Sequence, residues 1–303
     1  MKGLIGAFAL FLCNKQNALY LEIEEGLLMS EVMMTRIYEL MVVLYAISLV
    51  FYFTDYLYKW VKARRIAFWF VSVVWFLQVI YFVWFIFEMK RFPILSLFEG
   101  VYFYAWLLTT LSIVLHCIAR VDLPVFFINV LGFIFVTIHL FAPNDVVQPV
   151  RESLISEMLF IHISFAIVSY AAFSLSFVFS VLYLILYRML KEKKYHHLWS
   201  RLPSLQQTST WMNYSILVGI PVLFVSLVLG LEWALLSLDG LSVFDAKIIG
   251  SFILTVIYIS IILLHRSGKL VGTSFAWTQI YTFLFVVINF FLGSKLSNFH
   301  LWY

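Results

Sequence analysis

Eight long apolar runs in the sequence restrict the chain to very few folds. Each is about as long as the twenty or so residues that a helix needs to cross the hydrocarbon core of a bilayer. Backbone groups in lipid must find partners inside the protein, which favours helices, and the runs lack the alternation of an outer-membrane barrel. The sequence therefore predicts an all-α bundle of about eight transmembrane helices. The runs lie at roughly 37–58, 66–88, 97–117, 123–141, 158–187, 211–235, 246–265 and 274–294.

The amount of apolar side chain agrees with a membrane protein. Of the 303 residues, 64% are hydrophobic and 12% are charged, which is more apolar surface than one water-soluble core can bury. The formal net charge of +4 is explained by loop charges, so membrane lipid is the expected surrounding and no nucleic-acid partner is expected. Cys13 and Cys117 form no Cys-x-x-Cys motif, so neither a disulfide framework nor thiol chemistry is indicated.

Basic residues collect in alternate loops, and this pattern predicts an orientation. Cytoplasmic loops carry the excess of lysine and arginine, so both termini are expected to be extracytoplasmic. The loop from Leu190 to Arg201 is the largest basic element. It is either a topology signal that also attracts anionic lipid or a docking surface for a cytosolic protein. The predicted cytoplasmic set is Lys59, Lys62, Arg64, Arg65, Arg120, Arg188, Lys191, Lys193, Lys194, Arg201, Arg266 and Lys269. The other side holds Arg36, Lys90, Arg91, Arg151, Lys247 and Lys295.

Residues 1–33 differ from the rest of the chain. Their apolar patch, Leu4 to Cys13, is too short to span a bilayer, and no small-residue cleavage site follows it. Glu24-Glu25-Gly26 is what a purine-rich ribosome-binding sequence would encode if it were read in frame, and Met29 follows shortly after. We therefore expect an N-terminal extension, with Met29 as a candidate native start, before a single transmembrane domain at 34–303.

Polar side chains repeat at helical spacing in two of the runs and indicate which faces point inward. A polar group that faces lipid lacks partners, so both stripes are expected to face the bundle interior. They consist of Glu99, Tyr102, Trp106, Thr109 and His116, and of Ser251, Thr255, Tyr258 and His265. In the run at 158–187, one face carries a histidine above a seam of small residues that suits close helix packing: His162, Ala166, Ser169, Phe173, Ser176 and Ser180.

Five histidines are expected near helix ends, at two levels. His162, His139 and His300 would lie on the outer side. His116 and His265 would lie near the same level on the inner side. Two imidazoles can hold haem iron between them, whereas a single histidine at an interface can serve as a hydrogen-bonding group alone. The sequence shows no nucleophile-base arrangement, phosphate loop or carboxylate cluster, so neither catalysis nor a metal other than haem iron is expected.

Three segments resemble the cytochrome c assembly family of membrane haem-handling proteins, and together they cover about residues 91–300. The first runs from Arg91-Phe92-Pro93 through Leu97-Phe98-Glu99 to Phe103-Tyr104-Ala105-Trp106. The second runs from Ile161-His162-Ile163-Ser164 to Ser169-Tyr170-Ala171-Ala172. The third runs from Gly230 through Trp233-Ala234 to Leu264-His265-Arg266 and ends at His300. The ordered triplet His162, His265 and His300 is the most specific part of the resemblance.

The resemblance implies a haem site on each side of the membrane. His162 and His300 would flank an extracytoplasmic haem b, and His265 would be the ligand of the inner site. The family's tryptophan-rich loop, which forms a haem platform, is reduced here to Trp233 and the segment Phe244-Asp245-Ala246-Lys247.

The reduced loop and the eight-span layout resemble the HemX-type branch of Gram-positive bacteria. That branch is associated with haem biosynthesis, in which the protein lowers the amount of glutamyl-tRNA reductase. The resemblance implies a regulator in a bacterial plasma membrane, with that reductase or another cytosolic protein as partner. Two alternatives stay open: a haem-delivery component of cytochrome c maturation, and a transporter or structural membrane partner.

Overall fold

A computed structural model describes residues 32–58, 60–119, 122–141, 157–193, 202–237 and 245–296. All regular structure in these residues is helical, and eight helices are long and apolar enough to cross a membrane, as the sequence predicts. The first is Val32–Tyr58. It is followed by α2 (Val61–Met89), α3 (Leu97–Ala119), α4 (Asp122–Leu140), α5 (Glu157–Lys191), α6 (Leu205–Ser237), α7 (Ala246–Arg266) and α8 (Gly272–Leu296).

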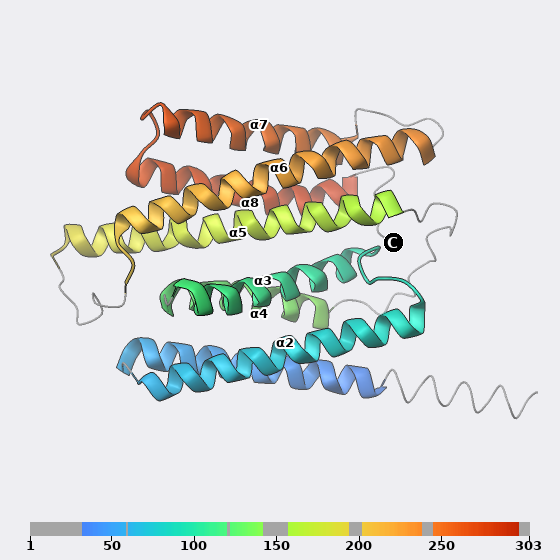
Figure 1. The fold of residues 1–303 in the computed structure, drawn as a ribbon, viewed down its shortest axis with the longest axis horizontal. Helices are drawn as coiled ribbons and strands as arrows, with labels where there is room; N and C mark the ends of the chain where they lie inside the picture. Colours follow the sequence, from blue (N-terminus) through green and yellow to red (C-terminus); the bar gives the residue numbers. More distant parts are fainter. Residues whose placement is uncertain are drawn as a thin grey trace, which may run out of the picture.

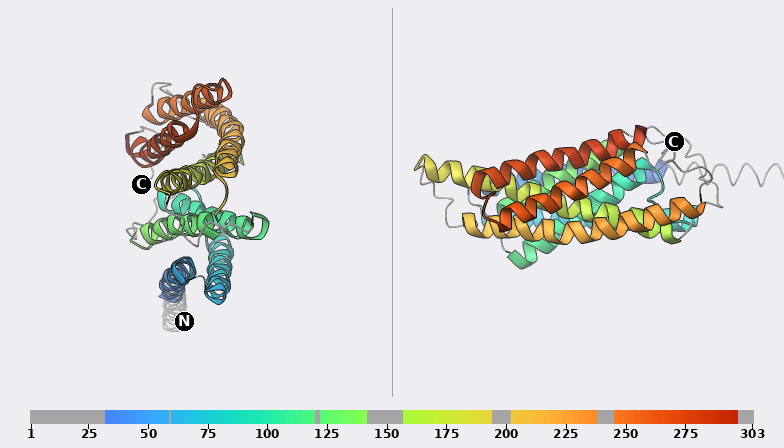
Figure 2. Two further views of the ribbon diagram at one scale, coloured as in Figure 1. Left: turned by 90° about the vertical axis from the view of Figure 1, so that its left-hand side faces the viewer. Right: turned by 90° about the horizontal axis from the view of Figure 1, so that it is seen from above.

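Successive helices run in opposite directions and form an elongated array (Figure 1). The pair α3 and α4 lies between the first helix and α2 on one side and α5 to α8 on the other (Figures 1 and 2). The last four helices form a closed ring, because α5 packs against α6 and α8, and α7 packs against the same two helices. Arg64, Arg188 and Arg266 therefore gather at one end of the array.

Several helices begin before the apolar run that predicts them. At the start of α6, Ser204 and Gln207 form reciprocal hydrogen bonds between side chain and backbone, at 3.1 and 3.0 Å. Such a capping box satisfies amide groups that would otherwise lack partners, so the helix starts in polar sequence six residues ahead of the predicted span at 211. Asp245 caps α7 by accepting a 2.9 Å hydrogen bond from the Lys247 amide.

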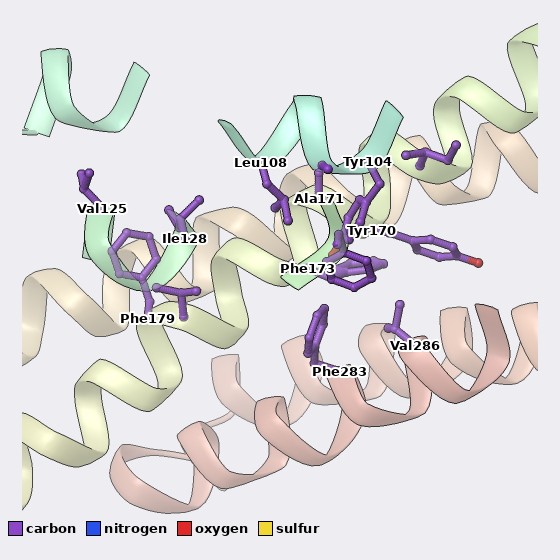
Figure 3. Close-up of a cluster of buried hydrophobic side chains, with 14 of the residues drawn as sticks. Tyr104, Leu108, Val125, Ile128, Tyr170, Ala171, Phe173, Phe179, Phe283 and Val286 are labelled. Carbon is purple, nitrogen blue, oxygen red and sulfur yellow. The ribbon is translucent and has the colours of Figure 1, made fainter. Parts of the chain in front are cut away.

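The two predicted polar stripes face the protein interior, as expected, and so does the small-residue seam of α5. Tyr102, Thr109, Phe173 and Tyr258 are fully buried. The rings of Phe173 and Tyr258 stack at 3.9 Å between α5 and α7, and Gly219 of α6 lets Phe173 approach that helix closely. Figure 3 shows how this cluster joins side chains of α3, α4, α5 and α8 into one core.

A buried polar network joins the first helix to α3 and α4. The hydroxyl of Tyr45 donates a 3.1 Å hydrogen bond to the side-chain oxygen of Asn129, whose amide group donates to Ser112 at 2.6 Å. Tyr45 also lies 3.4 Å from the hydroxyl of Thr109. Because all these groups are buried and bonded, the network fixes the register of the first helix against the rest of the bundle.

Candidate functional site

His162 lies on the second turn of α5, and its ring faces α6. Its Nδ1 atom is 2.6 Å from the backbone oxygen of Ser226 and 3.1 Å from the hydroxyl of the same residue. The Ser226 hydroxyl in turn donates a 2.8 Å hydrogen bond to the backbone oxygen of His162. Two contacts with one residue of α6 therefore hold the imidazole in a single orientation, and the third joins the backbone of His162 to the same residue.

The surface of α6 is shaped to receive the His162 ring. A Cβ atom at Gly230 would stand 2.4 Å from both Nδ1 and Cε1 of His162, so the ring occupies the space that any other side chain would need. Trp233 lies one turn further along α6, on the same face as Ser226 and Gly230. It is 9% exposed, and its indole nitrogen is buried without a hydrogen-bond partner.

Lys247 lies in the first turn of α7, at the same end of the α5–α8 helix ring as His162. Its ammonium donates to the backbone oxygens of Asn289 and Phe290 on α8 at 3.1 and 3.3 Å, and it lies 5.3 Å from the centre of the Phe290 ring. The Phe290 ring in turn packs edge-on against Tyr170 of α5, with the ring centres 6.1 Å apart, so one aromatic ring connects the ammonium with the helix that carries His162. The imidazole and the ammonium therefore belong to one site at the predicted outer end of the α5–α8 ring.

His265 lies in the last turn of α7, at the opposite end. Its Nδ1 atom is 2.8 Å from the backbone oxygen of Leu270, in the turn that leads to α8. Its ring stacks on Phe275 of α8, with the ring centres 4.0 Å apart and the planes at 11°. A backbone hydrogen bond and an aromatic face thus fix this second imidazole as well.

The two tethered histidines share a protonation pattern that suits metal ligation. A backbone carbonyl only accepts hydrogen bonds, so Nδ1 carries the proton in both rings, and Nε2 keeps its lone pair. Metal-binding histidines characteristically donate their other N–H to a carbonyl or carboxylate, which fixes the tautomer and the ring orientation. The residues present therefore fit a haem iron at Nε2 of His162 and at Nε2 of His265.

The other two described candidates lie elsewhere. His116 stacks on Phe68 of α2 at 4.4 Å, whereas His265 packs on α8, and α3, α4 and α5 lie between α2 and α8 (Figures 1 and 2). The structure does not bring these two inner histidines into contact, although the sequence analysis grouped them. His139 lies among tyrosine rings rather than beside His162. Its ring centre is 4.9, 5.1 and 6.2 Å from those of Tyr38, Tyr102 and Tyr81.

The segment Arg91 to Glu99 forms a compact ionic turn at the start of α3. Arg91 and Glu99 make a bidentate ion pair, with N–O distances of 2.7 and 2.8 Å. Glu99 also accepts hydrogen bonds from the backbone amides of Leu95 and Ser96 at 2.8 and 3.2 Å. Both carboxylate oxygens of Glu99 are engaged within the turn, so these contacts hold the chain in place before α3.

Part of the predicted outer site falls outside the described residues. His300 lies outside them, and so do residues 238–244 of the loop between α6 and α7, which we expected to cover the site. Residues 1–31 of the expected N-terminal extension at 1–33 also lie outside them. Among the side chains that the structure does describe, no group of three or more His, Cys, Asp or Glu residues is placed to hold a metal ion.

Comparison with known proteins identifies the family. The model of a family described as "Cytochrome C assembly protein" matches residues 94–300, which is more than half of the chain. This chain belongs to the cytochrome c assembly protein family. Two curated proteins of similar sequence are both called "Protein HemX". The one from Bacillus subtilis (strain 168) is 44% identical over 274 residues, covering 90% of this chain and 99% of its own length. The one from Brevibacillus brevis is 38% identical over 268 residues, covering 88% and 98%.

For this cytochrome c assembly family protein, three features of the site escaped the sequence analysis. Ser226 and Gly230 position His162, and their spacing of four residues on one helix face was the available signal. Lys247 was counted only as a loop charge and as part of the reduced platform segment. A lysine two positions after the helix-capping Asp245, at the start of an apolar run, could have suggested an inward-facing cation.

Proposed function

We propose that this protein is a haem-binding regulator of tetrapyrrole biosynthesis in a bacterial plasma membrane, where it lowers the level of glutamyl-tRNA reductase. Haem binding rests on one observation above all: two imidazoles, His162 and His265, each have Nδ1 tied to a backbone oxygen and Nε2 left as a ligand. The family match and the relatives called "Protein HemX" support the same reading.

Haem b is the proposed cofactor because imidazole ligands hold it without a covalent link. When bound, it would supply an iron that accepts imidazole nitrogens as ligands. His162 would hold it on the extracytoplasmic side, with His300 as the proposed second ligand. His265 would serve an inner site. Trp233 lies one turn beyond Gly230 on the same face of α6, and its buried indole N–H, which has no partner among the described residues, is available to donate to a ligand.

The basic end of the bundle is proposed to contact the cytosolic partner. In this proposal both termini are extracytoplasmic, and the helix ends that carry Arg188, Lys191 and Arg266 face the cytosol. A ligand shifts a conformational equilibrium only through different affinities for two states. His265 joins α7 to the α7–α8 turn through its contact with Leu270, so iron binding there would bear directly on the geometry of a cytosolic turn.

Haem delivery for cytochrome c maturation is the second candidate. The family description favours it, because the matched family is one of cytochrome c assembly proteins. The sequence argues against it, because only Trp233 and a short segment remain of the family's tryptophan-rich loop. Neither the family description nor the relatives' names denotes a catalytic activity.

The test is an absorption spectrum of the purified protein together with a cellular measurement. We expect a Soret band, and we expect replacement of His162 or His265 by alanine to weaken or shift it. A His139→Phe variant serves as the matched control, because that ring lies among tyrosines. In cells, the wild-type protein should lower glutamyl-tRNA reductase in the presence of haem. An unchanged reductase level together with a loss of mature c-type cytochromes on deletion would favour delivery instead.

A further inference from the structure

Lys247, a half-buried cation, has no role in the function proposed so far. Its side chain does not extend toward the membrane surface, where lysines near helix ends commonly place their charge. Its ammonium instead lies between α7 and α8, 3.1 and 3.3 Å from two backbone oxygens of α8. A charge kept inside a membrane-spanning bundle is costly, and such residues generally mark a ligand or ion site.

The position of Lys247 relates it to the outer imidazole. The two side chains lie at the same end of the α5–α8 ring, His162 on the second turn of α5 and Lys247 on the first turn of α7. The Phe290 ring beside the ammonium also packs edge-on against Tyr170 of α5, with the ring centres 6.1 Å apart. His162 offers Nε2 to a metal, and Lys247 offers a positive charge on the same side of the bundle. A ligand that used both would combine a metal centre with an anionic group.

We infer that Lys247 binds a carboxylate of the ligand held by His162, and that it thereby selects porphyrins with free propionates. This inference rests on the haem-binding function proposed above. Haem carries two propionate groups, and an ammonium-carboxylate hydrogen bond is among the stronger polar contacts in a protein. The propionate would share the ammonium with the oxygens of Asn289 and Phe290, which already hold it in place.

A purely structural role for Lys247 makes a different prediction. If the lysine only joins α7 to α8 through backbone oxygens and the Phe290 ring, its removal would weaken every porphyrin to the same extent. If it binds a propionate, removal would weaken only porphyrins that have a free carboxylate. The two roles can therefore be distinguished by comparing the affinities of porphyrins with and without a free carboxylate, and by comparing proteins with and without Lys247.

The experiment titrates purified protein in detergent with haem and with haem dimethyl ester, followed by the Soret band. We expect wild-type protein to bind haem about tenfold or more tightly than the diester, because a hydrogen bond to a charged group is worth roughly that much. Lys247→Gln should lose this preference by weakening haem alone, and Lys247→Arg should retain most of it. Lys90→Gln, which removes an exposed lysine from the same side, should behave as wild type.

Each outcome decides the question. Equal affinity of wild-type protein for the two ligands would overturn the inference without any variant, so a Lys247→Gln protein that fails to fold does not prevent the test. Parallel weakening of both ligands in a folded Lys247→Gln variant would assign the lysine to helix packing. No Soret band from wild-type protein with either ligand would instead refute the proposed haem binding itself.

Discussion

The imidazole Nδ1 of His162 lies 2.6 Å from the backbone oxygen of Ser226, so the orientation of a residue on α5 is set by α6. A backbone oxygen cannot be removed by substitution, so replacing Ser226 would remove its two hydroxyl contacts with His162 but keep this acceptor. The ring can still be displaced from the other side. Gly230 provides that opportunity, because the ring fills the place of its missing side chain.

Gly230→Ala should weaken haem binding by about 10 to 100-fold, the usual effect of disturbing a group that orients a metal ligand. The added Cβ would lie 2.4 Å from the imidazole, so the ring must move away from the Ser226 oxygen. Haem titration followed by absorbance measures the change.

Gly100→Ala is the matched control for that substitution. Its Cβ would lie 3.6 Å from the nearest atom of Ile167, an ordinary contact. Equal haem affinity in the Gly230 and Gly100 variants would argue against His162 as a positioned ligand.

Glu99→Gln should lower the free energy of unfolding by up to about 3 kcal/mol, because it leaves a largely buried arginine without its carboxylate. The side chains of Arg91 and Glu99 are 23% and 8% exposed. Unfolding in mixed detergent micelles, followed by circular dichroism, measures the change. The comparison is Glu39→Gln, which breaks an ion pair whose side chains are 74% and 46% exposed and should cost less than about 1 kcal/mol. Similar losses in the two variants would show that burial of the Arg91–Glu99 pair contributes nothing.

Tyr45→Phe should destabilise the protein by about 1 to 3 kcal/mol, because it leaves the buried oxygen of Asn129 without its 3.1 Å donor. The same unfolding measurement applies. We expect the haem spectrum to stay unchanged, since the network joins the first helix to α3 and α4 and does not touch the α5–α8 ring. A loss of haem binding without a loss of stability would contradict this separation.

His265→Ala should abolish the response of glutamyl-tRNA reductase levels to haem, if the inner imidazole senses haem for the pathway. Neutralising Lys191, Lys193 and Lys194 together should weaken that output while leaving the haem spectrum unchanged, because these charges belong to the proposed docking surface. Immunoblots of the reductase, with haem supplied or withheld, measure both. A wild-type response from the His265 variant would remove haem at that position as the signal.

The sequence predicts the fold of this protein well because bilayer thickness fixes the length of a spanning helix. The ends of α7 and α3 agree closely with the apolar runs at 246–265 and 97–117. The start of α6 was placed too late, since capping by Ser204 is a local polar signal that a search for apolar runs passes over. The inward polar faces were also predictable, because helical spacing determines which side chains share a face.

The relations between helices were much harder to predict. The sequence places His116 and His265 at one level, but periodicity says nothing about which helices are neighbours, and the two rings pack in different interfaces. The tether of His162 to Ser226 depends on the crossing of α5 and α6, which the sequence pattern does not specify. Lys247 was overlooked for the same reason, because the backbone oxygens that its ammonium contacts belong to α8, and the sequence does not show that α8 lies beside α7.

Helix α5 has 35 residues and is therefore about 52 Å long, well beyond the roughly 30 Å of the hydrocarbon core. This one helix carries His162 near one end and Lys191 at the other, about 44 Å apart. Tilting the helix by about 5° around its middle would swing each end through about 2 Å in opposite directions. A displacement of the His162 end through its contact with α6 would therefore be accompanied by an opposite displacement of the Lys191 end.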